Sequence, residues 1–228
     1  MNETHLISIA IDGPSGAGKS TLARRLASTL HFLYVDTGAI YRTIAYYAYA
    51  NHLDPSDEAA VLAALPDIRI ELRHDAEGLQ RMVLNGEDVT DAIRLPQISQ
   101  YASVVSAYPG VRAFLLEMQR DFARKGSVIM DGRDIGTVVL PHADVKIFLT
   151  ASPEARAHRR CLELEQRGTP EPFDQVLSEI QQRDWDDSHR ETAPLRQAED
   201  AVVVDTTELN FEESLAALLT VVRGKAAL

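Results

Sequence analysis

Short apolar runs alternate with stretches of helical periodicity along most of the chain, a pattern typical of an α/β fold with a largely parallel sheet. Apolar runs with the length of buried strands lie at residues 6–11, 32–35, 128–130, 145–149 and 202–204. Apolar positions at helical spacing lie at 20–30, 39–51 and 211–222. We therefore predict about five parallel strands flanked by helices.

Two regions interrupt this alternation. Residues 68–72 alternate strictly between apolar and polar, and the run 82–84 meets the turn dipeptide Asn85-Gly86, so a small antiparallel insert is expected within 66–96. Residues 153–194 are helical in pattern, rich in arginine and poor in large apolar side chains. We expect this second region to be mobile and partly exposed.

Composition excludes several classes of protein. The 228 residues include 23 basic and 34 acidic side chains, a net charge of −11, which argues against a dedicated DNA-binding protein. Cys161 is the only cysteine, so no intrachain disulfide framework or cysteine-based zinc site is expected. The seven histidines show no metal-ligand spacing. Without a long apolar run or a signal-peptide pattern, we expect a cytoplasmic protein with no membrane partner.

The strongest motif is a phosphate-binding loop. Residues 13–20 read GPSGAGKS, which matches G-x-x-x-x-G-K-[ST] between a predicted strand and a predicted helix. In such a loop backbone N–H groups surround a phosphate, the lysine reaches the β- and γ-phosphates, and the serine hydroxyl can ligate Mg²⁺. The candidate nucleotide-binding residues are Gly13, Pro14, Ser15, Gly16, Ala17, Gly18, Lys19, Ser20 and Thr21.

The loop indicates nucleotide binding but not the reaction. No asparagine begins the N-K-x-D motif of a GTPase, so a G protein is disfavoured. Asp131 follows a predicted strand and weakly matches the acidic residue of an ATPase, although the Gly-Arg-Asp that follows it resembles a second anion site. An alternative from another class is a non-catalytic nucleotide-binding switch.

Further candidates follow other predicted strands, where ligands bind in open parallel sheets. Thr37 can cap the next helix or donate to a phosphate, and Arg42 is either a phosphate ligand or a solvated helix charge. The segment 131–134, Asp-Gly-Arg-Asp, is either a salt-bridge cluster or an anion site. Three arginines share one helical face, and four tyrosines between 41 and 49 are expected to serve mainly as core. The arginines are Arg156, Arg159 and Arg160.

Taken in order, GPSGAGKS, DTGAIYR, DGRDIGTVV, KIFL and R-x-x-R-R resemble the bacterial cytidylate kinases, which are P-loop nucleoside monophosphate kinases. The resemblance runs from about residue 7 to residue 211. It implies one kinase domain with a core of 1–36, 103–152 and 195–228. It further implies an acceptor-binding region, 37–102, and a lid, 153–194.

The resemblance also implies transfer of a phosphoryl group from ATP to CMP or dCMP with Mg²⁺, by a monomer that binds no nucleic acid. Ser20 would hold the magnesium ion, partly through water. The implied catalytic residues are Lys19, Asp131, Arg133, Arg156, Arg159 and Arg190. The implied CMP-binding residues are Thr37, Tyr41, Arg42, Ser103, Arg112, Asp131, Arg133, Asp134, Arg183, Asp187 and Arg190. A small P-loop kinase that acts on UMP, AMP or an alcohol such as shikimate remains the enzymatic alternative.

Overall fold

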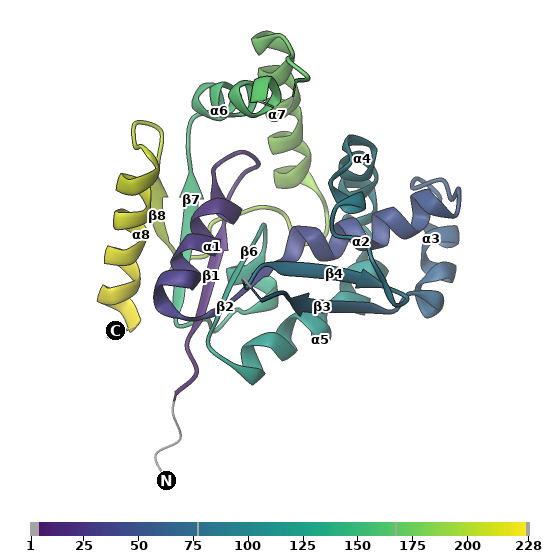
Figure 1. Ribbon diagram of the computed structural model, residues 1–228, viewed down its shortest axis with the longest axis horizontal. Helices are drawn as coiled ribbons and strands as arrows, with labels where there is room; N and C mark the ends of the chain where they lie inside the picture. Colours follow the sequence, from purple (N-terminus) through teal and green to yellow (C-terminus); the bar gives the residue numbers. More distant parts are fainter. Residues whose placement is uncertain (1–4, 77, 167, 227–228) are drawn as a thin grey trace. The chain divides into compact units, whose positions relative to one another are not determined.

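The computed structural model describes residues 5–76, 78–166 and 168–226, drawn in Figure 1. The chain forms two compact units. The first unit contains residues 1–34 and 123–228, and the second contains residues 35–122. The two units are described separately below.

A five-stranded sheet has the strand order β2-β6-β1-β7-β8. Its strands are β1 (Ser8–Asp12), β2 (Leu33–Asp36), β6 (Val128–Gly132), β7 (Val145–Thr150) and β8 (Val202–Asp205). β1 pairs in parallel with β6 and β7, and β7 pairs in parallel with β8. The register sets Asp12 opposite Gly132, so two loops that carry predicted site residues leave neighbouring strands at the same level. The predicted parallel sheet is confirmed.

Two helices of the first unit pack against the sheet in one apolar core. They are α1 (Lys19–Leu30) and α8 (Phe211–Ala226), and Figure 1 shows them beside β1 and β7. Leu26 of α1 and Leu218 of α8 are fully buried with Ile9 and Ile147 of the strands. This shared core holds the start of α1 at the carboxyl end of β1.

The charged region predicted to be helical forms two helices, α6 (Pro153–Gln166) and α7 (Phe173–His189). They pack against each other through their own small apolar cluster, which contains Ala157, Leu164, Val176 and Ile180. A π-helical turn, Ile135–Val139, follows β6 in the same unit. π-turns often occur at functional sites.

The second unit contains a three-stranded antiparallel sheet in the order β3-β4-β5. Its strands are β3 (Ile70–His74), β4 (Gln80–Leu84) and β5 (Glu87–Asp88). Asn85 and Gly86 both have positive φ, 50° and 91°, as a tight hairpin turn requires. The predicted antiparallel insert is therefore confirmed, with β3 shifted toward the C-terminus of the expected run.

The helices that accompany this sheet are α2 (Thr37–Ala50), α3 (Glu58–Ala64), α4 (Pro96–Val105) and α5 (Pro109–Lys125), the last of which continues into the first unit. The expectation that the α2 tyrosines serve mainly as core holds only in part. Ile40, Ile44 and small residues such as Ala45 form the buried face of α2, while three of its tyrosines are partly buried and Tyr49 is 38% exposed. Among the described residues, no helix is both long and apolar enough to cross a membrane.

Candidate active site

The phosphate-binding loop joins β1 directly to α1. Gly13 has φ 150°, and a Cβ atom there would lie 1.9 Å from the carbonyl oxygen of Leu149 on β7. Gly18 caps α1 in the left-handed region with φ 86°. Glycine is therefore required at both ends of the loop, because other side chains would clash or strain the backbone. Thr21, the last residue of the candidate set, is exposed on the first turn of α1.

Lys19 is 6% exposed, and its Nζ donates to the Pro14 carbonyl at 2.7 Å. Burial lowers the pKa of Lys19 well below its usual value, and the charge of Arg133 lowers it further. The carboxylates of Asp131 and Asp187 act in the opposite direction. The lysine is thus held inside the loop in a strongly charged environment.

Ser20 and Asp131 are joined although they lie 111 positions apart. The Ser20 Oγ donates to Asp131 Oδ2 at 2.8 Å, and the Tyr34 hydroxyl donates to Asp131 Oδ1 at 2.8 Å. Asp131 is 3% exposed at the end of β6. A loop serine beside a strand-end aspartate is the donor set with which P-loop enzymes hold Mg²⁺. These residues therefore fit a magnesium ion.

Next to this pair, Arg133 and Arg190 contact acidic partners. Arg133 Nε donates to Asp187 Oδ2 at 2.7 Å, and Arg190 Nη2 lies 3.7 Å from Asp134 Oδ1. Burial would raise the pKa of Asp187, but the charges of Arg133, Arg183 and Arg190 outweigh it, and the pKa is lowered. The structure thus brings five of the predicted acceptor-site residues into one cluster in which arginines and aspartates are neighbours. They are Arg133, Asp134, Arg183, Asp187 and Arg190.

Arg156 lies against the phosphate-binding loop. Its guanidinium donates to the Ser15 carbonyl at 3.0 Å and to both carboxylate oxygens of Asp184, at 3.0 and 2.6 Å. Its Nε donates to the Ala151 carbonyl at 2.9 Å, and the residue is only 3% exposed. One buried guanidinium therefore joins the segment that follows β7, helix α7 and the phosphate-binding loop.

The other two arginines of α6 have different surroundings, although the three were predicted to share a face. Arg159 donates to Thr206, through Nη1 to the hydroxyl at 3.2 Å and through Nη2 to the carbonyl. Arg160 is partly exposed and pairs with Glu163 at 3.2 Å on its own helix. Arg156 and Arg159 therefore contact segments that follow strand ends, whereas Arg160 contacts only its helix among the interactions described.

Four further candidates lie on the helices of the second unit. Arg42 pairs with Asp36 at 2.9 Å and is only partly exposed, so it is not a solvated helix charge. Arg112 is 7% exposed, lies 5.4 Å from the ring centroid of Tyr41 and donates to the Ser106 carbonyl at 2.9 Å. Ser103 is exposed on α4.

Of the two roles that the sequence left open for Thr37, the structure excludes the helix cap. The cap is Asp36, whose side chain accepts from the Ala39 N–H at 2.9 Å. The aspartate lies at the last non-helical position before the helix, where a side-chain oxygen reaches the first-turn N–H groups. Thr37 itself is buried, with 3% exposed, as the first helical residue.

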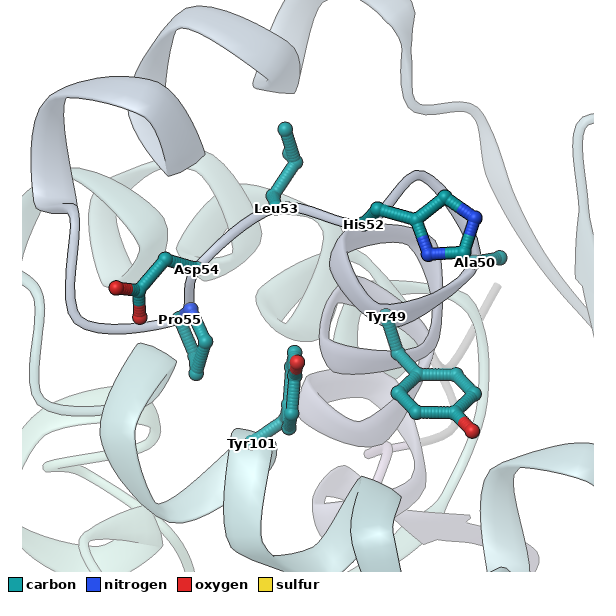
Figure 2. Close-up of a pocket in the computed structure, with 7 residues that line it drawn as sticks. All are labelled: Tyr49, Ala50, His52, Leu53, Asp54, Pro55 and Tyr101. Carbon is teal, nitrogen blue, oxygen red and sulfur yellow. The ribbon is translucent and has the colours of Figure 1, made fainter.

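A pocket of about 480 Å³ lies elsewhere in the second unit, and Figure 2 shows the residues that line it. Tyr49 and His52 come from the end of α2 and the following loop, and Tyr101 comes from α4. The rings of Tyr49 and Tyr101 meet edge to face, with centroids 5.6 Å apart. None of the predicted site residues lines this pocket.

Sequence reasoning missed three contributors to the first-unit cluster. Asp12 accepts a hydrogen bond from the backbone N–H of Ile135, the residue after Asp134. The Tyr34 hydroxyl donates to Asp131, and Asp184 accepts from Arg156. Asp12 and Tyr34 carry one usable signal, because each is a polar residue directly beside apolar strand positions, Asp12 after residues 9–11 and Tyr34 between Leu33 and Val35. Asp184 carries none, since it lies in a helix with many charged residues.

Comparison with known proteins identifies the family. The sequence model of a family described as cytidylate kinase matches residues 9–224. A protein of Caldicellulosiruptor bescii named cytidylate kinase is 51% identical over 215 residues, which are 93% of this chain and 94% of that protein. One of Carboxydothermus hydrogenoformans with the same name is 50% identical over 95% of this chain and 97% of that protein.

A solved structure supports the fold. The crystal structure of an uncharacterized protein from Eubacterium ventriosum aligns with a TM-score of 0.51 at 11% identity, over 96% of this chain and 99% of that one. At this identity the likeness concerns the fold alone. The family model and the curated relatives cover nearly the whole chain, and the chain is therefore an enzyme of the cytidylate kinase family.

Proposed function

We propose that this protein transfers the γ-phosphoryl group of ATP to CMP or dCMP, which yields ADP and CDP or dCDP. The observation that carries the proposal is the Ser20–Asp131 bond. It joins a complete phosphate-binding loop to the strand end from which Arg133 and Asp134 project. Relatives about half identical over nearly their full length are named cytidylate kinase.

On the donor side, backbone N–H groups of residues 13–20 and the Lys19 ammonium would bind the ATP phosphates. Ser20, which bonds Asp131, would hold Mg²⁺, partly through water, and the ion supplies positive charge to the transferring phosphoryl group when bound. Asp131 would also organise the acceptor-side arginines. Arg156, Arg159 and Arg160 would act as lid arginines around the transferring phosphoryl group. The charged α6–α7 region suits that task because phosphoryl transfer depends on positioning and charge rather than on covalent chemistry.

On the acceptor side, Arg42, Arg133 and Arg190 would hold the acceptor phosphate, because a guanidinium matches phosphate oxygens with two parallel donors. Arg183 and Asp187 would contact the sugar, and Thr37 and Tyr41 would line the acceptor pocket.

Asp134, Ser103 and Arg112 would read the base. The Asp134 carboxylate accepts from the N4 amino group of cytosine but meets an oxygen lone pair in uracil. A site built on such a bond strongly rejects an analogue that lacks the donor.

The division into a core (1–36, 103–152 and 195–228), an acceptor region (37–102) and a lid (153–194) is part of the proposal. The compact unit of residues 35–122 contains the whole proposed acceptor region, and α6 and α7 form the proposed lid. Closure of a lid excludes water, so that ATP is not hydrolysed without an acceptor. The monomeric state and the cytoplasmic location stay predictions from the sequence.

The test is a coupled assay of ADP formation from ATP and Mg²⁺ with CMP, dCMP, UMP, AMP and GMP in parallel. Fastest turnover with CMP and dCMP is expected. Fast turnover with another nucleotide would retain the kinase and overturn the assignment of Asp134, Ser103 and Arg112. Nucleotide binding without turnover on any acceptor would contradict the proposed reaction and favour the switch.

A further inference from the structure

The π-turn that follows Asp134 is capped from another strand. The N-cap residue of the turn is Asp134, and its side chain makes no cap hydrogen bond. Instead, the N–H of Ile135 donates to Asp12 Oδ1 at 2.8 Å, and the N–H of Gly136 donates to Asp12 Oδ2 at 2.7 Å. Both oxygens of one carboxylate thus accept the first two amide protons of the turn.

This arrangement departs from the usual local solution. Aspartate is among the best N-cap residues because its carboxylate readily reaches the N–H groups of its own helix. Asp134 lies in that position, yet its carboxylate lies toward Arg190, with an oxygen 3.7 Å from the guanidinium. Asp12 occupies the amide protons that would otherwise attract Asp134.

Asp12 is well placed for this role. It is 5% exposed and ends β1, directly opposite Gly132 in the parallel register. A Cβ atom on Gly136 would lie 3.3 Å from Asp12 Oδ2 and 3.2 Å from Cδ of Lys146, so the turn lies tightly against the carboxylate. Burial raises the pKa of Asp12 to about 6, despite the two backbone bonds that lower it. A buried carboxylate is costly, and its retention points to a task that an apolar residue would not perform.

We propose that Asp12 is a positioning residue for the acceptor base: by capping the Ile135–Val139 turn it keeps the Asp134 carboxylate directed away from its own backbone and toward the acceptor. The inference rests on the proposed role of Asp134 as the base-reading residue. In this role Asp12 acts through Asp134 and not through a substrate contact of its own. Without its carboxylate, Asp134 turns to cap its own helix and is lost to the acceptor.

The donor side has hydrogen bonds of its own, and the charge of Asp12 affects the pKa of Lys19 less than the charges of Arg133, Asp131 and Asp187 do. Lys19 bonds the Pro14 carbonyl and Arg156 bonds the Ser15 carbonyl, so the phosphate-binding loop keeps these contacts when Asp12 is replaced. The inference therefore predicts that replacing Asp12 impairs the use of CMP and the discrimination between CMP and UMP, and leaves ATP binding nearly unchanged.

The test uses Asp12→Asn in the full chain. Asparagine has nearly the same shape but offers only one acceptor, so one of the two amide protons loses its partner. Relative to the wild type, we expect kcat/KM for CMP to fall about 10- to 100-fold and the preference for CMP over UMP to narrow about tenfold. The KM for ATP should change less than about twofold.

Asp144→Asn is the matched control. Asp144 also accepts a backbone N–H, from Ser8 at 2.8 Å, but at the opposite end of β1. This variant should leave all three kinetic quantities unchanged. Hydrogen exchange of the Ile135 and Gly136 amides, slow in the wild type and faster in Asp12→Asn, reports the cap without reference to activity.

The possible outcomes separate the inference from the proposed function. A wild type that does not phosphorylate CMP overturns the proposed function and, with it, the acceptor role of Asp12, whatever the amides show. If the wild type is active and Asp12→Asn keeps the CMP preference while its amides lose protection, the positioning role is wrong. Unchanged amide protection in the folded variant would refute the cap itself.

Discussion

The Asp184–Arg156 pair offers the sharpest test of how the phosphate-binding loop is supported. Asp184→Ala removes two hydrogen bonds, of 3.0 and 2.6 Å, from a guanidinium that is 3% exposed. The arginine retains the carbonyls of Ala151 and Ser15. We therefore expect a loss of stability and a loosening of the loop at Ser15.

The size of the effect follows from burial. Removing one partner of a fully buried ion pair costs about 3–5 kcal/mol, whereas exposed pairs contribute about 0–1 kcal/mol. The Asp184 side chain is 26% exposed, so water can partly replace it, and two carbonyls remain on Arg156. We expect a loss of about 2 kcal/mol in the free energy of unfolding. In a chain of this length that corresponds to a fall of roughly 4–8 °C in Tm.

The assay is thermal unfolding followed by circular dichroism, together with steady-state kinetics in which ATP and CMP are varied separately. The KM for ATP should rise several-fold and the KM for CMP should stay near its wild-type value. Asp186→Ala is the control, because Asp186 lies on the same helix and accepts from the exposed Gln182 side chain at 2.9 Å. If Asp184→Ala and Asp186→Ala unfold at the same temperature, the buried guanidinium does not depend on its carboxylate and the reasoning is refuted.

Three further changes probe the same unit. Gly13→Ala should destabilise the fold and abolish ATP binding in a calorimetric titration, because its Cβ would lie 1.9 Å from the Leu149 carbonyl oxygen. Lys19→Met should lower kcat roughly 10²-fold or more. The same substitution should raise the Tm of the nucleotide-free protein at neutral pH. The lowered pKa of Lys19 means that a charged lysine is less favourable in the folded state than in the unfolded state, and methionine removes that cost. Folding raises the pKa of Asp12 from 3.8 to about 6, so protonation of this carboxylate favours the folded state. The stabilisation is fully present below pH 3.8 and is lost as the pH rises through 6. Urea unfolding should show a wild-type loss of about 1 kcal/mol between about pH 5 and about pH 7 that Asp12→Asn lacks.

The parallel sheet and the hairpin could be predicted because their signals are local. Each apolar strand run is bounded by polar turn residues, and Asn85-Gly86 has few alternatives to a tight turn. The helices α3, α4 and α5 were not predicted as elements. In α5, for example, the fully buried Val111 and Leu115 share a helical face with the buried polar residues Arg112 and Gln119, which obscures the apolar periodicity.

Candidate residues were found where a motif supplied them, but their partners were not. The bond between Ser20 and Asp131 forms because β1 pairs with β6. This pairing brings together residues that lie more than a hundred positions apart. That Asp36 rather than Thr37 caps α2 depends on where the helix begins, and a sequence pattern locates helix ends only to within a few residues.

Two of the arginines assigned to phosphates, Arg133 and Arg156, share one property that bears on mechanism. Arg133 bonds Asp187 and Arg156 bonds Asp184, so each guanidinium has a carboxylate on α7 as its acceptor. When a phosphate binds, each of these guanidinium groups exchanges a carboxylate acceptor for a phosphate acceptor. The binding free energy that results is therefore smaller than for an arginine that has no carboxylate partner beforehand. In return, each side chain is held in one orientation, which reduces the conformational entropy lost on binding. Because Asp187 belongs to α7 and Arg133 follows β6, this exchange at Arg133 would loosen α7 from the strand ends, whereas the exchange at Arg156 would separate α7 from α6. The acid–arginine pairs thus offer a physical link between phosphate binding and movement of the proposed lid.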